Sequence, residues 1–104
     1  MAVDYEAVTT AAKQYADSVR RNMAVDRIVL FGSYAKRAAD TLSDVDICVF
    51  FPTFGDRKRT DVIGDLLKLT HDYDVFIEPI AFPTSEIERG NPFVEEVLSS
   101  GVEL

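Results

Sequence analysis

The feature that most constrains this chain is a strand that ends in a Gly-Ser turn and is followed by a second strand with two acids one residue apart. The apolar segment 27–31 runs directly into Gly32 and Ser33. After a short loop, a second apolar segment carries Asp44 and Asp46. Side chains of a strand alternate between its two faces, so these two acids point the same way. The chain must therefore hold two like charges side by side.

Paired carboxylates of this kind favour a bound cation, because repulsion between like charges grows when they are buried. Mg²⁺ is a hard ion that prefers carboxylate oxygens. The Gly32-Ser33 turn, if it opens a helix, adds free backbone N–H groups that suit a phosphate. Together these features indicate nucleotide chemistry. The structural alternative for the acids is that Asp44 caps the strand end and Asp46 pairs with a nearby arginine.

Length and composition fit one domain, residues 1–104, with a single core. A hydrophobic content of 47% and a charged content of 28% exclude a disordered tail or a coiled coil. The net charge of −7 argues against a chain that grips nucleic acid by its phosphates. No apolar run reaches the length of a membrane span, and the early acids do not fit a signal peptide. We therefore expect a cytoplasmic protein without membrane contact, in which the lone Cys48 is a buried small hydrophobe.

Hydrophobic periodicity predicts secondary structure in the order α-β-α-β-α-β-α. Asp4 is the expected N-cap of the first helix, and Gly101 the expected stop of the last. The predicted fold class is α/β (α+β), a small mixed sheet flanked by helices, with its acids at one end. The helices are expected over 4–22, 33–40, 60–73 and 92–99, with a short helical turn at 83–86, and the strands over 27–31, 44–51 and 74–82.

Two positions offer a third carboxylate near the pair, as two-metal phosphoryl-transfer sites require. The third strand is expected to start at Asp74, so Asp74 and Glu78 share one face by parity. The structural alternatives are that Asp74 is a solvated acid after a helix, and that Glu78 is an edge-strand acid beside Pro79. The residues alone leave both positions open.

The same residues resemble a known family. The resemblance rests on two runs, Gly32-Ser33-Tyr34-Ala35-Lys36 and Ser43-Asp44-Val45-Asp46-Ile47. These runs resemble the signature of the DNA polymerase beta-like nucleotidyltransferase superfamily, a Gly-Ser turn followed by Asp-x-Asp. The matching core covers about residues 28–82. The small size makes the chain similar to minimal nucleotidyltransferases, which are often paired with a HEPN-domain partner in prokaryotic toxin–antitoxin operons.

The resemblance implies roles for the matching positions. Its nucleotide-binding set is Gly32, Ser33, Lys36 and Ser43, and its catalytic and metal-binding set is Asp44, Asp46 and Asp74. Asp74 is preferred as third carboxylate, because its apolar neighbours match the family's hydrophobic-Asp-hydrophobic context, and Glu78 is the alternative. The implied ion is Mg²⁺, with Mn²⁺ as a substitute. Relatives often have glycine where Arg37 stands.

The activity that the resemblance implies is transfer of a nucleoside monophosphate, AMP from ATP, to a hydroxyl of a protein partner, as in the antitoxin of a HEPN pair. The alternative is a nucleotide-binding or antitoxin module that acts by protein contact without catalysis. The acceptor, the preferred base and the oligomeric state, a homo-oligomer included, stay open at this stage.

Overall fold

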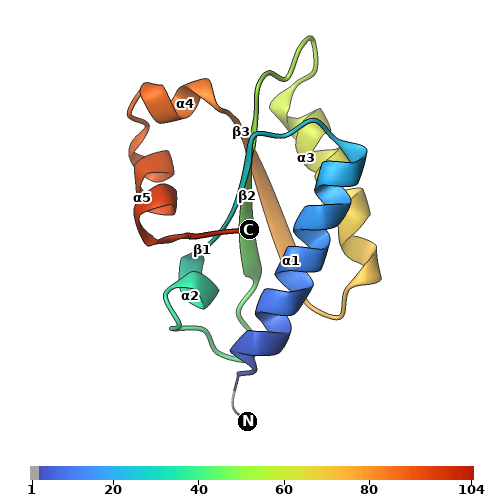
Figure 1. Ribbon diagram of the computed structural model, residues 1–104, viewed down its shortest axis with the longest axis vertical. Helices are drawn as coiled ribbons and strands as arrows, with labels where there is room; N and C mark the ends of the chain where they lie inside the picture. The colour runs from blue at the N-terminus through green and yellow to red at the C-terminus, as the bar shows by residue number, and fades with distance from the viewer. Residues whose placement is uncertain (1–2) are drawn as a thin grey trace.

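The computed structural model describes residues 3–104, which form a mixed four-stranded sheet between two layers of helices (Figure 1). The strand order is β3-β2-β1-β4; β1 runs antiparallel to β2 and β4, and β2 runs parallel to β3. The predicted fold class is thereby confirmed. The elements are α1 (Tyr5–Asn22), β1 (Arg27–Phe31), α2 (Gly32–Ala35), β2 (Val45–Phe51), α3 (Arg59–Lys68), the 3-10 turn η1 (Leu69–Asp72), β3 (Ile77–Pro83), α4 (Ser85–Glu88), α5 (Pro92–Ser100) and β4 (Val102–Glu103).

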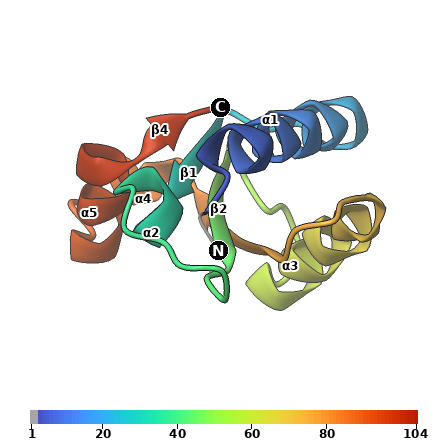
Figure 2. The ribbon, with the colours of Figure 1, turned by 90° about the horizontal axis from the view of Figure 1, so that it is seen from below.

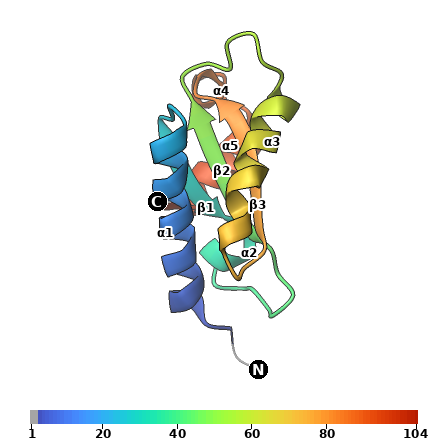
Figure 3. The same cartoon turned by 90° about the vertical axis from the view of Figure 1, so that its right-hand side faces the viewer.

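The two faces of the sheet carry separate helical layers. Helices α1 and α3 cover one face, while α4 and α5 lie on the other (Figures 2 and 3). Helix α2 lies at the end of β1, with Tyr34 and Ala35 packed against the core under α1 and α3. Side chains of β2 alternate between the two cores, so Ile47 and Val49 pack under α1 and α3, whereas Cys48 and Phe50 pack under α5. Asp46 has the parity of Cys48, which places it on the α5 face.

Strand β3 is an edge strand, as Pro79 predicted. The backbone groups of its odd-numbered residues point away from β2, and Pro79 and Pro83 have no N–H to offer there. The outward carbonyl of Ala81 accepts a hydrogen bond from Arg59 Nε at 2.8 Å, and the Arg59 guanidinium lies 4.2 Å from the centre of the Phe82 ring. This edge is therefore protected against pairing with a further strand.

The prediction that Asp74 opens the third strand is wrong, because β3 begins at Ile77. Asp74 lies in an exposed bend after η1, and the helix expected over 60–73 ends at Lys68 before that turn. The Tyr73 ring packs edge-on against Tyr15 of α1, with ring centres 6.0 Å apart. Tyr73 therefore packs beside α1, and pairing with β2 begins only at Phe76, whose carbonyl accepts a hydrogen bond from Val45 N at 2.7 Å.

The helix expected over 33–40 is a single turn, α2. Arg37 ends it with a φ of +55°, in the left-handed region that favours glycine. Its guanidinium lies 4.3 Å from the centre of the Tyr5 ring, and the Tyr5 hydroxyl accepts a hydrogen bond from Ala39 N at 3.2 Å. Contacts with Tyr5 of α1 therefore stabilise the left-handed backbone at Arg37. Glycine adopts this conformation more easily, which explains why it suits position 37.

Helix α5 ends at Gly101 as expected, but regular secondary structure continues beyond it. It continues into β4, a two-residue strand that the sequence pattern did not predict. Arg27 of β1 forms an ion pair with Glu103 of β4, and Leu104 N donates to Ile28 O at 2.8 Å. These contacts cover the free edge of β1. A strand of two residues is too short to show the alternation of polar and apolar side chains from which strands are predicted.

Candidate active site

Asp46 lies near the start of β2, between residues of both neighbouring strands. It is in register with Phe31 of β1 and with Glu78 of β3. Residues directly opposite each other on paired strands project from the same face, so the three side chains form one row across the sheet. Asp46 is half-buried and Glu78 is exposed. The row therefore combines two carboxylates with an aromatic ring.

The surroundings of Asp46 disfavour its negative charge. Burial, then the Glu78 carboxylate and then the Asp44 carboxylate raise the pKa of Asp46 from 3.8 to about 6. A bound cation would offset all three effects, because it favours the negative charge of Asp46. A donor set made only of carboxylate oxygens suits Mg²⁺ or Mn²⁺. The residues present therefore fit a hard divalent ion.

The carboxylates are near one another without forming a closed ligand cage. Within residues 3–104, no three side chains among histidine, cysteine, aspartate and glutamate stand close enough together to hold a metal ion as they are. Asp44 and Glu78 are both exposed. Binding of an ion therefore requires these two side chains to turn toward Asp46.

Gly32, the first residue of α2, lies directly against the Asp46 carboxylate. Its φ is +74°, and a Cβ at this position would overlap Asp46 Oδ2 and lie 3.2 Å from Asp46 Cγ. Phe31 precedes the helix and gives it no side-chain cap. The fold thus brings the Gly-Ser turn and the second acid of Asp-x-Asp into contact, which only a glycine at position 32 permits.

Replacing Gly32 with alanine is expected to destabilise the protein by about 2 to 4 kcal/mol, from left-handed backbone strain plus overlap with Asp46. Gly55 is the matched control, because its φ is +61° and a Cβ there meets nothing within 4 Å. Gly55→Ala should cost only the backbone strain, about 1 kcal/mol. Urea unfolding of both variants measures the difference. Equal losses would contradict the close approach of Gly32 to Asp46.

The other predicted site residues have partners or positions of their own. Lys36 Nζ forms an ion pair with Glu96 Oε1 of α5 at 3.1 Å. The Ser43 hydroxyl accepts a hydrogen bond from Asp40 N at 3.0 Å and closes the turn just before Asp44. The exposed Asp74 is not among the groups that raise the pKa of Asp46. Cys48 is a buried free cysteine, as expected, and burial raises its pKa to about 12.

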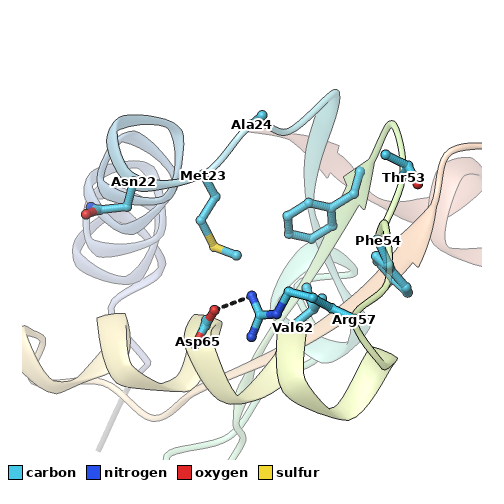
Figure 4. A pocket seen from close by; sticks show the side chains of 9 residues that line it. Asn22, Met23, Ala24, Thr53, Phe54, Arg57, Val62 and Asp65 are labelled. Carbon is cyan, nitrogen blue, oxygen red and sulfur yellow. Dashed lines mark hydrogen bonds and ion pairs between the residues drawn. The ribbon is translucent and has the colours of Figure 1, made fainter.

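A cleft of about 300 Å³ lies at the opposite end of β2, beside Phe51 (Figure 4). Met23, Phe54 and Val62 provide its apolar walls. The charged groups in it already neutralise each other, because Arg57 Nη1 and Asp65 Oδ2 form an ion pair at 2.5 Å. The cleft lacks the uncompensated carboxylates found around Asp46, so we place the candidate active site at Asp46.

The stability of the metal-free protein is expected to depend on pH through Asp46. Because the pKa of Asp46 is higher in the folded protein, its contribution is present below about pH 4 and lost as the pH rises through about 6. Asp46→Asn should therefore be more stable than the wild type near pH 7.5, by about 1 kcal/mol after allowance for solvent screening. Urea unfolding should show this gap closing toward about pH 4. A gap that does not change with pH would contradict the charge effect.

Comparison with known proteins identifies the family. Residues 12–100 match the model of the nucleotidyltransferase domain, so the chain belongs to that family. This confirms the family predicted from the Gly-Ser turn and the paired acids. A Methanocaldococcus jannaschii protein named "Putative protein adenylyltransferase MJ0141" is 34% identical over 83 residues, which cover 77% of this chain and 79% of the relative.

Two solved structures share the fold. One is a crystal structure described as "a putative nucleotidyltransferase from Sulfolobus solfataricus", with a TM-score of 0.70 and 18% identity over 98% of this chain and 87% of that one. The other is described as "putative minimal nucleotidyltransferase", with a TM-score of 0.62 and 23% identity over 98% of this chain and 97% of that one. Across residues 3–104, no helix has the length and hydrophobicity needed to cross a membrane.

Proposed function

We propose that this nucleotidyltransferase transfers AMP from ATP to a hydroxyl group of a protein, with a divalent metal ion. The observation that carries the proposal is the contact between the Gly32 turn and Asp46, whose charge is opposed by Glu78 and Asp44. A site of this kind suits a phosphate group bound together with a cation. The name of the 34%-identical relative supports AMP as the transferred group and protein as the acceptor.

Asp44, Asp46 and Glu78 are the proposed metal-binding carboxylates. Glu78 takes the place of Asp74, the position preferred from the sequence, because Glu78 is in register with Asp46 and affects its pKa. Asp74 lies outside β3 and has neither relation to Asp46. Mg²⁺ is the proposed ion, and Mn²⁺ its substitute.

The residues have distinct roles in the proposed reaction. Backbone N–H groups at Gly32 and Ser33 bind the phosphates, and the three carboxylates hold the ion that neutralises phosphate charge when bound. The acceptor oxygen forms a bond to the α-phosphorus, the bond from that phosphorus to the bridging oxygen breaks, and pyrophosphate leaves. A Glu78 carboxylate oxygen accepts the proton of the attacking hydroxyl.

A protein acceptor fits the surface charge. A net charge of −7 suits a basic protein better than a polynucleotide. We assign the acceptor to a separate basic protein, for which a HEPN-domain protein is the proposed partner.

The test combines the purified chain, the protein encoded by the adjacent gene, Mg²⁺ and ATP labelled at the α-phosphate. We expect the partner to gain the mass of one AMP unit, and we expect EDTA or Asp46→Asn to abolish the gain. A tight complex that forms without any mass change, and that Asp46→Asn leaves intact, would overturn the proposal in favour of a module that acts by contact.

A further inference from the structure

Phe93, at the start of α5, lies beside the row of side chains that contains Asp46. Its ring is 5.8 Å from that of Phe31, the residue opposite Asp46, and 5.8 Å from that of Phe82 on β3. On this face of the sheet, Phe82 lies two positions of the same parity beyond Glu78. Phe82 is in register with Phe50, four residues beyond Asp46 along β2. A ring that contacts both Phe31 and Phe82 therefore lies across the middle of this face, and only the Phe31 side chain separates it from the row that contains Asp46.

Phe93 is held firmly and yet remains open to solvent. Asn91 caps α5, its Oδ1 accepting a hydrogen bond from Phe93 N at 3.0 Å, and Pro92 fixes the first helical turn. The neighbouring Val94 is fully buried, whereas 48% of Phe93 is exposed. An aromatic ring with one packed side and one open side is a rigid surface for stacking.

The ion pair between Lys36 and Glu96 ties α5 to α2, the helix that begins with Gly32. Phe93 and the Gly-Ser turn therefore belong to two neighbouring helices (Figure 2). Because the Phe93 ring packs on Phe31, the residue directly before Gly32, a nucleotide bound at Gly32 would have an aromatic face close to its phosphates.

We infer that Phe93 is the platform on which the nucleobase of the bound triphosphate stacks. The inference rests on the proposed function and adds the part of the substrate that the carboxylates and the Gly-Ser turn do not touch. Every base has an aromatic face, and stacking on a protein ring contributes to affinity with little preference for sequence. Phe93 thus distinguishes a nucleoside triphosphate from inorganic polyphosphate.

Calorimetry with Mg²⁺ and two ligands, ATP and inorganic tripolyphosphate, tests the inference. Phe93→Leu keeps an apolar side chain against Phe31 and Phe82 but removes the stacking ring. We expect it to weaken ATP binding about tenfold and to leave tripolyphosphate binding unchanged. Phe93→Tyr should bind ATP as the wild type does. Phe54→Leu, at the opposite end of the sheet, is the control and should bind both ligands normally.

The outcomes separate this inference from the proposed function. Wild-type protein that binds neither ligand overturns both. Wild-type protein that binds ATP, with Phe93→Leu equally tight or equally weakened toward the two ligands, overturns the stacking role alone. Thermal unfolding without ligand verifies that all four proteins are folded at the temperature of the calorimetry.

Discussion

Asp46→Asn is expected to lower the rate of nucleotidyl transfer by about a thousandfold or more, equivalent to about 4 kcal/mol of transition-state stabilisation. Asparagine keeps the shape of the side chain against Gly32 but removes the charge that would hold the cation. Because Glu78 and Asp44 oppose that charge in the metal-free protein, the variant should fold at least as well as the wild type. The measurement is the initial rate of label transfer from ATP at saturating Mg²⁺.

Asp56→Asn is the matched control for this loss, because Asp56 is an exposed acid beyond the far end of β2. It removes the same charge from the protein without touching the site, so its transfer rate should equal that of the wild type. A rate for Asp46→Asn within about tenfold of the wild type would show that the ion, if one is needed, is held elsewhere.

Glu78→Gln is expected to reduce transfer by about a hundredfold or more, whereas Asp74→Asn should change it by less than about threefold. The reason is positional: Glu78 is opposite Asp46 in the parallel ladder, and Asp74 precedes the strand. The two variants each remove one acid from the same segment, so each controls for the other. The opposite ranking would return the third carboxylate to Asp74.

The same pair of variants has a readout that does not depend on activity. Of the two carboxylates that raise the pKa of Asp46, Glu78 has the larger effect. Glu78→Gln should therefore lower that pKa, and Asp74→Asn should leave it unchanged. Carboxyl chemical shifts followed through a pH titration measure both. An unchanged Asp46 pKa in Glu78→Gln would contradict the row of acids across β2 and β3.

Local sequence signals were sufficient for the core of this fold. The apolar strand before Gly32, the alternation through Asp46 and the amphipathic stripe of α1 are all properties of neighbouring residues. The edge position of β3 could also be predicted from the sequence, because Pro79 has no N–H to donate to a strand ladder. Each of these elements lies where the sequence predicted it, to within a few residues.

The identity of the third acid required tertiary information. The sequence places both Asp74 and Glu78 in apolar surroundings, but β3 begins only at Ile77, after the bend in which Tyr73 packs against Tyr15. Strand register then decides which acid lies opposite Asp46, and register follows from the whole sheet. Phe93 was missed for a related reason, since an aromatic residue in the first turn of an amphipathic helix is indistinguishable from a core residue until its exposure is known.

The most direct test of the proposed site is a crystal structure of the chain with Mg²⁺ and an ATP analogue that has a non-hydrolysable bond between the α- and β-phosphorus atoms. We expect one ion bound by Asp46 together with Asp44 and Glu78, and the phosphates at the backbone of Gly32 and Ser33. A nucleotide bound instead in the cleft beside Phe51, or at Gly32 with no ion at Asp46, would contradict the assignment of this site as a metal-dependent nucleotidyltransferase centre.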